Sequence, residues 1–223
     1  LTKVPPYIRI NRVVRDIPHI SIEGGLKCSN MRQLASNRMK KKKIPCHDIR
    51  NREAKFKTFN PNDMLLDIIE YPSSCGTEYF IQYCSTDKMT LYGFIRLRLN
   101  KENNDVMPCL RECALIRELH VYGQHTGVGS SNTQSVQHKG LGSRLLQKAE
   151  DIARSHAYNK IVVISGVGVR NYYRKKGYVL GTHEYMYKPL YYTCTILTTI
   201  SVRMFIALCM VIVSCMCVYI ELM

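Results

Sequence analysis

The sequence predicts a mixed α/β domain that begins near residue 58. Apolar segments of strand length follow one another after Pro61, as in "EYFIQYCS" and "LYGFIRLRL". A long run from Leu141 then repeats apolar residues at helical spacing. A short apolar run, "KIVVISG" at 160–166, has the composition of a buried strand. Together these three observations indicate strands interleaved with helices around one core.

The expected elements follow in chain order. "PNDMLLDIIEY" at 61–71 has the pattern of a short amphipathic helix, and the two strands quoted above come next. "CALIRELHVYG" at 113–123 predicts a third strand. The following helix has an apolar stripe formed by Leu141, Leu145, Leu146, Ala149, Ile152 and Ala153. The buried strand, a short helix "RNYYRKK" that ends at Gly177, and a strand from Tyr178 to Tyr187 complete the domain.

Positive charge is concentrated in the N-terminal part of the chain. The formal net charge is +15, and residues 1–60 hold 15 Lys and Arg against four Asp and Glu. Within this part, "NMRQLASNRMKKKKI" predicts a helix that starts at an Asn30 cap and is closed by Pro45. A basic region of this kind indicates a polyanionic partner, with nucleic acid favoured over acidic lipid; the alternative is a solvated basic face.

The ten cysteines do not resemble a disulfide framework, because their spacing is irregular and nothing at the N-terminus of the sequence resembles a signal peptide. We therefore expect a reducing compartment, with a cytoplasmic and also a nuclear location. No C-x-x-C pair occurs, and Cys109 and Cys113 lack the third cysteine of a cluster motif. We predict no metal site in this chain.

The C-terminal tail, 191–223, differs in composition from the rest. Residues 204–220 form a run of seventeen residues without a charge. At about 1.5 Å per helical residue this run nearly spans a hydrocarbon layer of about 30 Å. A membrane anchor, a hydrophobic helix packed on the domain, and translated sequence foreign to the mature protein remain three alternatives.

The stretch "QHKGLGSRLLQKAE" at 137–150 places two glycines at the start of the predicted long helix. A helix N-terminus has unpaired N–H groups and a partial positive charge, so it suits a phosphate, and glycines remove the Cβ atoms that would obstruct one. The stretch lacks the Gly-Lys-Ser/Thr end of a P-loop and the third glycine of a dinucleotide fingerprint. Taken alone it is a weak motif.

Its context resembles the GNAT superfamily of acetyl-CoA-dependent acyltransferases: strand, Q-x-x-G-x-G, amphipathic helix, strand, then a short helix bearing tyrosines. The resemblance implies a GNAT fold, with a mixed, mostly antiparallel sheet flanked by helices, and a diverging strand that pairs with the pantetheine arm. It assigns acetyl-CoA binding to Glu118, Leu119, His120, Val121, Gln137, Lys139, Gly140, Leu141, Gly142, Ser143 and Tyr172. The catalytic candidates are Tyr172 and Tyr173. A neutral phenol could protonate the departing thiolate, and neighbours on a helix point about 100° apart, so one of the two should face the coenzyme.

Longer stretches narrow the resemblance. "RELHVYG", "QHKGLG" and "ISGVGVRNYYRKKGY", together with "VVRDIP", "NMRQLA" and "CHDIRNRE" nearer the N-terminus, are similar to the family of Elongator catalytic subunits. That family combines a radical S-adenosylmethionine domain with a GNAT domain and begins carboxymethylation of the wobble uridine of tRNA. The implied partners are tRNA and other Elongator subunits; membrane contact through 204–220 stays open.

On this resemblance, 1–57 is a basic linker at the end of a radical domain that is missing here, 58–190 is the acetyltransferase domain and 191–223 is the tail. The iron–sulfur cluster and S-adenosylmethionine would be held outside the chain. RNA-binding candidates are Arg9, Arg12, Arg15, Arg32, Lys40, Lys41, Lys42, Lys43, Arg50 and Arg52, with Arg50 and Arg52 alternatively pairing with Asp48 and Glu53. Where some relatives have a C-x-C-x-x-C zinc motif, this sequence has Cys46, Asp48 and Asn51.

Two other functions remain open at this level. One is a protein lysine acetyltransferase, such as a histone acetyltransferase, for which Glu118 is the only plausible general base. The other is a noncatalytic scaffold module within a complex. The intact Q-x-x-G-x-G and the tyrosine pair favour coenzyme binding over a degenerate scaffold.

Overall fold

A computed structural model describes residues 1–13, 18–25, 28, 30–55, 61–100, 107–122 and 140–190. Contacts group 1–190 into one unit and Tyr191–Met223 into a second. The second unit, including the apolar run 204–220, lies outside the described residues. Within the described ranges, no helix combines the length and apolar character needed to cross a bilayer.

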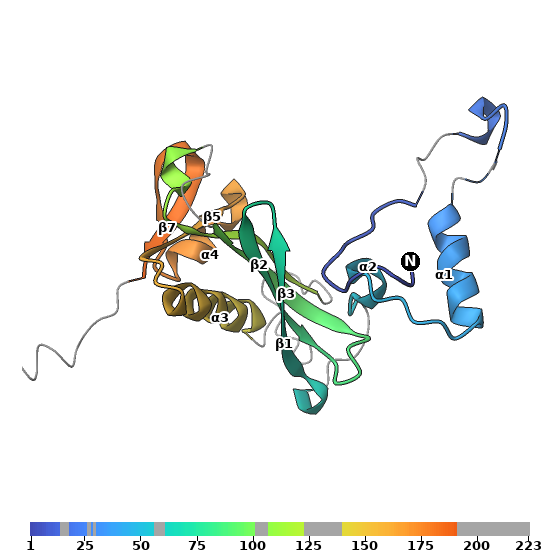
Figure 1. Cartoon of the computed structure of the whole chain (residues 1–223), viewed down its shortest axis with the longest axis horizontal. Coiled ribbons are helices and arrows are strands. Elements are labelled where there is room, and N and C mark those ends of the chain that lie inside the picture. The colour runs from blue at the N-terminus through green and yellow to red at the C-terminus, as the bar shows by residue number, and fades with distance from the viewer. Residues whose placement is uncertain are drawn as a thin grey trace, which may run out of the picture. The chain divides into compact units, whose positions relative to one another are not determined.

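A seven-stranded mixed sheet, in the order β1-β2-β3-β4-β5-β7-β6, organises the chain (Figure 1). Its strands are β1 (Leu65–Ser73), β2 (Gly76–Cys84), β3 (Leu91–Asn100), β4 (Ala114–Val121), β5 (Lys160–Ile164), β6 (Val179–Leu180) and β7 (Tyr185–Pro189). Only β4 and β5 pair in parallel; the other neighbours are antiparallel. The fold class expected from the sequence, a mostly antiparallel GNAT sheet with flanking helices, is confirmed.

The helix expected over 61–71 is wrong. After a 3₁₀ turn at Pro61–Asp63, the segment forms β1, which pairs with β2 from Leu65↔Cys84 to Ser73↔Gly76. In a short run such as Met64–Ile69, apolar residues fit a helical period and a strand period almost equally well. Pairing with the strongly apolar β2 decides the outcome in favour of the strand.

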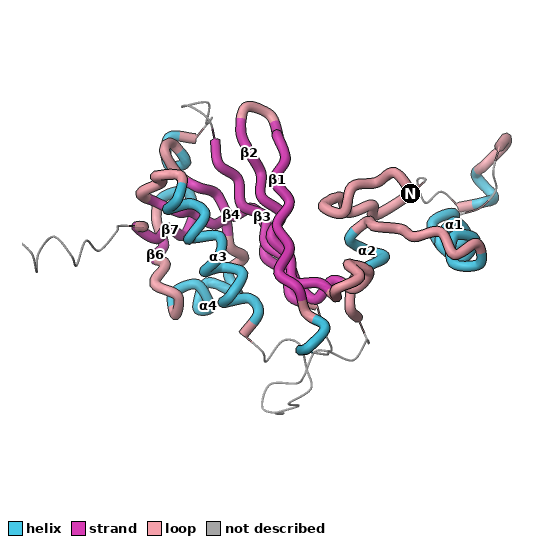
Figure 2. The backbone as a smooth tube through the Cα atoms, turned by 60° about the horizontal axis from the view of Figure 1, so that its bottom comes forward, coloured by secondary structure: helices cyan, strands magenta, loops and turns pink. Residues whose placement is uncertain are grey.

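Helix α3 (Leu141–Ser155) packs on one face of the sheet, as Figure 2 shows. Its predicted stripe is buried, except that Ile152 is only partly covered. The stripe meets Tyr79, Ile81, Ile95 and Leu97 of the central strands in the main core. The shorter α4 (Arg170–Arg174) follows β5 and stops before Gly177, whose φ of +85° favours glycine.

The single strand expected from Tyr178 to Tyr187 is instead a hairpin. β6 and β7 are joined by a turn at Thr182–Glu184, in which His183 and Glu184 have positive φ values. Neither residue is a glycine, which is the usual signal of a left-handed turn position, so the local sequence does not indicate the turn. Other short 3₁₀ turns lie at His19–Ser21, Pro108–Leu110 and Val167–Val169.

The N-terminal segment contains α1 (Met31–Lys41), close to its predicted span, and α2 (Ile49–Arg52). α2 and the chain near Tyr7 pack on the face of the sheet opposite α3, whereas α1 stands away from the sheet (Figures 1 and 2). Asn30 directly precedes α1 but makes no side-chain cap. Ile49 of α2 joins Phe80, Leu91 and Phe94 in a second core cluster. The sheet is therefore packed on both faces, by different parts of the chain.

Candidate functional site

The ladder between β4 and β5 stops after three residue pairs. Ala114–Ile116 pair with Ile161–Val163, whereas β4 continues to Val121 along β3. A register shift leaves Arg117 without a partner on β3, and such a bulge bends a strand. We call the region beyond this point, where β4 is no longer paired with β5, the splay. Within it, the β5-facing backbone groups of Glu118–Val121 have no strand partner among the described residues. An extended ligand could pair with them.

The start of α3 lies beside the end of β4. Gly140 caps the helix in a left-handed conformation, with φ +68° and ψ 16°. A Cβ atom added to Gly142 would lie 3.0 Å from the Tyr172 hydroxyl oxygen and 3.6 Å from Cγ2 of Val121. Glycine at position 142 thus lets α3, α4 and β4 meet closely, with the unpaired N–H groups of the helix start at the same place.

Tyr172 is the tyrosine that faces this meeting point. Its hydroxyl is buried and has no hydrogen-bond partner among the described residues. Burial raises the pKa of Tyr172. The nearby Ser143 side chain lowers the pKa by a smaller amount, although it makes no hydrogen bond of normal geometry with the Tyr172 hydroxyl. The phenol therefore stays protonated at neutral pH and can donate to a ligand.

Tyr173 points into the main core instead. It is 6% exposed and makes edge-on contacts with Tyr172 and Tyr178, at ring-centroid distances of 5.2 and 5.6 Å. Burial and the nearby Tyr172 raise the pKa of Tyr173 to about 12. The structure therefore brings one of the two predicted tyrosines to the helix start and gives the other a packing role.

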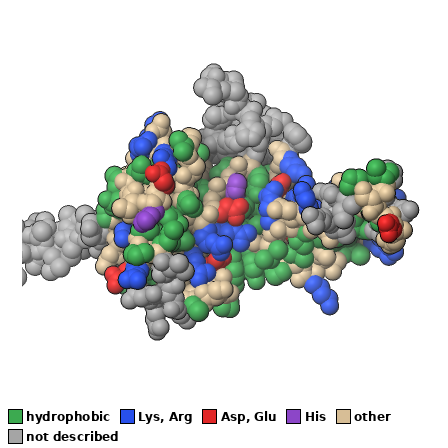
Figure 3. Space-filling model, turned by 90° about the horizontal axis from the view of Figure 1, so that it is seen from above, with side chains coloured by type: hydrophobic (Ala, Val, Ile, Leu, Met, Phe, Trp, Pro, Cys, Tyr) green, Lys and Arg blue, Asp and Glu red, His purple; other side chains and the backbone are tan. Residues whose placement is uncertain are grey.

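Glu118 and His120 lie on the sheet face that the N-terminal segment covers. The Glu118 carboxylate accepts a hydrogen bond of 2.9 Å from Nε of Arg96 and lies 3.0 Å from Nε2 of His120. The hydrogen bond from His120, together with Arg96, keeps the pKa of Glu118 below its usual value. On the face seen in Figure 3, histidine, acidic and basic side chains lie side by side near the middle of the molecule.

The other predicted coenzyme residues fall into three groups. Leu119 and Val121 turn toward the main core, and Leu141 is buried in it. Ser143 is half-buried in the first turn of α3. Gln137 and Lys139 lie outside the described residues. Most of these positions could therefore contact a ligand through backbone groups and not through side chains.

Arg96 is a residue of this site that sequence reasoning missed. Besides Glu118 it donates to the Tyr7 carbonyl, at 2.6 Å, and its guanidinium lies 5.4 Å from the centre of the Phe80 ring. It thereby links the N-terminal segment to the splay. The available signal was a charged side chain alternating with the buried Ile95 and Leu97 in a strand.

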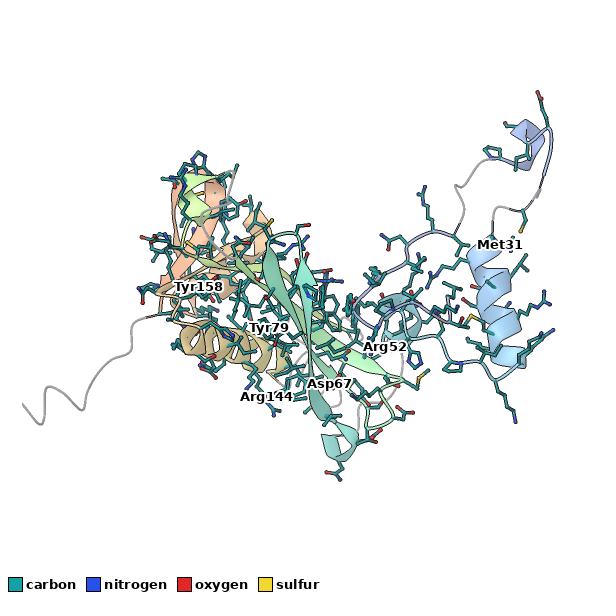
Figure 4. All side chains as sticks on the ribbon, viewed as in Figure 1. Met31, Arg52, Asp67, Tyr79, Arg144 and Tyr158 are labelled. Carbon is teal, nitrogen blue, oxygen red and sulfur yellow. The ribbon has the colours of Figure 1, made fainter. Side chains whose placement is uncertain are left out.

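Arg52 corrects the RNA-binding prediction. It is 1% exposed and lies between the N-terminal segment and the sheet (Figure 4). Its guanidinium donates to the carbonyls of His47 and Pro6, at 2.8 and 2.6 Å, and to the Gln82 side chain at 2.9 Å. A guanidinium has five donors, and burial is tolerated because so many of them are used. Arg52 is unavailable to RNA and is structural.

Other predicted RNA-binding arginines also have partners. Arg9 pairs with Glu53 and donates to the Tyr122 hydroxyl at 3.0 Å. Arg32 pairs with the buried Asp48 at 2.8 Å. Arg50 donates to the Asn11 carbonyl at 2.7 Å but stays exposed. Arg15 lies outside the described residues.

A groove of about 930 Å³ opens between α1 and residues 11–13. Its wall includes one acidic residue, Glu53, and five basic ones, Arg12, Arg32, Lys40, Arg50 and Lys55. Amides and hydroxyls of Asn11, Asn30, Gln33, Ser36 and Asn51 complete much of the lining. Lys41, Lys42 and Lys43 are exposed at the adjacent end of α1. This concentration of cations and hydrogen-bonding groups suits a phosphate-bearing chain.

Cys46, Asp48 and Asn51 form a hydrogen-bonded cluster, in which Cys46 and Asn51 also line this groove. The Cys46 thiol donates to Asp48 at 3.2 Å, and the Asn51 amide donates to the Cys46 sulfur at 2.7 Å. Throughout the ranges that the structure describes, no three His, Cys, Asp or Glu side chains are grouped to hold a metal.

Comparison with known proteins gives concordant matches. The chain is 41% identical over 195 residues to "Elongator complex protein 3" of Bos taurus, covering 85% of the chain and 36% of that protein. It is 40% identical to the "tRNA uridine(34) acetyltransferase" of Dehalococcoides mccartyi, covering 84% of the chain and 41% of that protein. The chain thus spans about two-fifths or less of these relatives.

A solved structure of Elp3 from the archaeon Methanocaldococcus infernus superposes with a TM-score of 0.68. It is 33% identical and covers 84% of this chain and 46% of the archaeal one. The model of the acetyltransferase (GNAT) family matches residues 47–178, which include the splay, the start of α3 and Tyr172. The chain therefore belongs to the acetyltransferase (GNAT) family.

Proposed function

We propose that this chain is the acetyl-CoA-using part of a tRNA uridine acetyltransferase. The observation that carries the proposal is the meeting of Gly142, Tyr172 and Val121 at the start of α3, next to the splay. Acetyl-CoA needs a binding site for its phosphates, a backbone partner for its extended arm and a side chain near its sulfur. The start of α3, the splay and Tyr172 are adjacent and could meet these three needs. The name of the Dehalococcoides mccartyi relative supplies the tRNA uridine, and that of the Bos taurus relative supplies the Elongator complex.

The residues present fit acetyl-CoA. The helix start, with no Cβ at Gly140 or Gly142, would hold the pyrophosphate, and Glu118–Val121 would hold the pantetheine arm. The thioester supplies an activated acetyl group. Tyr172 holds a proton next to Gly142, and burial keeps it there at neutral pH, so the phenol can protonate a departing thiolate. Its unpartnered hydroxyl is consistent with that use.

Glu118 is unsuited to the lysine acetyltransferase alternative. A base for a lysine ammonium works best with a raised pKa, whereas His120 and Arg96 lower the pKa of Glu118 and occupy its oxygens. The carboxylate is thus already engaged by the Arg96 guanidinium and the His120 ring. The tRNA substrate is favoured over protein lysine on this ground.

The basic groove beside α1 is the proposed tRNA contact, together with Lys41, Lys42 and Lys43. Its cations would bind phosphates, and its amides could reach unpaired bases. The radical step, with S-adenosylmethionine and an iron–sulfur cluster, is assigned to sequence outside this chain, as are contacts to other Elongator subunits. A cytoplasmic and nuclear location belongs to the same proposal.

Binding and hydrolysis test the proposal in turn. The chain is titrated calorimetrically with a non-hydrolysable acetyl-CoA analogue, and thioester hydrolysis is then followed with tRNA, with histone peptide, or with neither. We expect micromolar binding, and hydrolysis that tRNA alone stimulates. Absence of analogue binding would exclude any acetyl-CoA-dependent function, and stimulation by the peptide instead of tRNA would restore the lysine alternative.

A further inference from the structure

Unpartnered buried polar atoms are concentrated between β5 and α4. Among the described residues, four buried side-chain atoms lack a hydrogen-bond partner: Oε1 of Glu53, Oγ of Ser165, Nε of Arg170 and Oη of Tyr172. The Glu53 carboxylate still has an ion pair with Arg9, and the Arg170 guanidinium pairs with Glu184 through another nitrogen. The atoms of Ser165, Arg170 and Tyr172 fall within eight residues of sequence. Folded proteins satisfy nearly all such atoms, so this concentration indicates a segment built for a polar ligand.

Ser165 stands at the β5 side of the splay. The last β4–β5 pair is Ile116↔Val163, and Ser165 comes two residues later, directly after the end of β5. It is 8% exposed, whereas the preceding Ile164 is 58% exposed. By strand alternation Ser165 continues the side of Ile161 and Val163, which face the main core beneath α3. Tyr172 packs against that same core.

The chain after Ser165 leaves room for a slender ligand. Cβ atoms added to Gly166 or Gly168 would meet no atom within 4 Å. Val167 and Val169 expose their apolar side chains in the same turn. Open space, an apolar rim and a buried hydroxyl together fit an arm that alternates methylene groups with amides, the chemistry of acyl-pantetheine.

We propose that Ser165 is a further coenzyme-binding residue, whose hydroxyl hydrogen-bonds a carbonyl or amide of the acyl-pantetheine arm from the β5 side of the splay. This inference rests on the proposed use of acetyl-CoA. A hydroxyl can donate to a carbonyl oxygen or accept from an amide N–H, so it serves either group. Nothing is transferred to or from the serine, which acts by position alone.

The inference makes an unusual prediction about stability. Removing a buried hydroxyl that has partners destabilises a protein, whereas removing one without partners is neutral or stabilising. Ser85 provides the matched comparison: it is 3% exposed, and its hydroxyl accepts from the Thr90 N–H at 2.9 Å and donates to Asp87. Ser165→Ala and Ser85→Ala should therefore differ in the sign or size of their effects.

The test measures thermal unfolding and calorimetric binding for wild type, Ser165→Ala and Ser85→Ala in the 223-residue chain, with CoA and a non-hydrolysable acetyl-CoA analogue as ligands. Ser165→Ala should keep or raise the ligand-free Tm and weaken binding about five- to tenfold. Ser85→Ala should lower Tm by several degrees, roughly 2–4 °C per kcal/mol, and bind like wild type.

The outcomes separate cleanly. Equal weakening for both ligands places the hydrogen bond on a pantetheine amide, and weakening for the analogue alone places it on the thioester carbonyl; both support the inference. Wild-type affinity in Ser165→Ala, or a fall in its ligand-free Tm like that of Ser85→Ala, would overturn it while leaving the proposed function intact. If wild type binds neither ligand, the proposed function fails, and the inference fails with it.

Discussion

At the scale of single residues, adjacent side chains have unrelated roles. Tyr172 places an unpartnered hydroxyl beside Gly142, whereas Tyr173 packs into the core. The sequence predicted that only one of the pair would face the coenzyme, but it could not say which. That choice depends on the rotation of α4 about its axis, which is set by a local contact with Tyr178 and by the approach to Gly142 of α3, which is distant in sequence.

Tyr172→Phe should slow thioester hydrolysis about 100-fold or more, because general acid catalysis typically contributes that much. The ligand-free Tm should not fall, since the removed hydroxyl has no partner. Hydrolysis kinetics and calorimetry measure the two effects. Tyr173→Phe is the matched control and should retain most activity; full activity in Tyr172→Phe would refute the acid role.

Asp48 should make stability depend on pH. Burial alone would raise its pKa, but hydrogen bonds from Arg32 and Cys46 bring the pKa below the ordinary value. A depressed folded-state pKa means that this stabilisation is complete above the unfolded pKa of about 4 and is lost as pH falls through the folded pKa.

Asp48→Asn should therefore cost about 2 to 3 kcal/mol at pH 7 and flatten the loss of stability below about pH 4. Urea unfolding at a series of pH values measures both effects. Asp151→Asn, an exposed carboxylate on α3, is the control and should stay near wild type at pH 7. If the free energy of unfolding changed with pH in the same way for wild type and Asp48→Asn, Asp48 would not be the source of this pH dependence.

At the scale of elements, the sequence predicted best where one period is sustained. α3 and strands β2 to β5 were all predicted, because their apolar patterns are long or unambiguous. β1 was mistaken for a helix and the β6–β7 hairpin for one strand, because pairing with β2 and a turn at His183–Glu184 decided those segments. Arg52 was misjudged because charge normally marks a surface.

Gly142 tests how closely α3, α4 and β4 must approach. In Gly142→Ala, the new methyl group would lie 3.0 Å from the Tyr172 hydroxyl, so the tyrosine must move by a few tenths of an ångström. We expect analogue affinity to fall several-fold with a small change in Tm, measured by titration and calorimetry. Gly24→Ala, in the N-terminal segment, is the control, because its methyl group meets nothing within 4 Å. Unchanged affinity in Gly142→Ala would show that this contact is not needed.

The end of α1 tests the basic groove. Replacing Lys40, Lys41, Lys42 and Lys43 by glutamine should weaken tRNA binding at least about tenfold. It should also reduce the slope of log K against log salt by roughly 0.7 to 0.9 per lost phosphate contact. Lys148→Gln with Lys160→Gln, away from the groove, is the matched control. An unchanged salt slope in the fourfold variant would mean that these lysines are only a solvated surface.

At the scale of the whole described chain, different segments pack on the two faces of the sheet. α3 and α4 lie on the face of the proposed coenzyme site, and α2 with the chain near Tyr7 packs on the other face, where Arg52, Arg96 and Phe94 make the contact. The family match begins at residue 47, inside this N-terminal segment. A boundary near residue 57 thus marks a change in amino-acid composition, and side chains on its two sides pack together.

Arg52→Gln should show how strongly the two parts depend on each other. It leaves the carbonyls of Pro6 and His47 and the Gln82 side chain without their donor, which should cost about 3 to 5 kcal/mol. Chemical denaturation measures this cost, and hydrogen exchange should show residues 1–13 loosening first. The exposed Arg50→Gln is the control; an equal, small loss in both would deny Arg52 its structural role.

The splay also bears on solubility. A strand edge with free N–H and C=O groups usually invites a second chain to add to the sheet, which is a route to aggregation. Here the free edge lies in the interior of a seven-stranded sheet, between strands that are joined at one end. Because the edge is flanked by β3 and β5, it is less open to another chain than an outer edge of the sheet, which limits this route to aggregation.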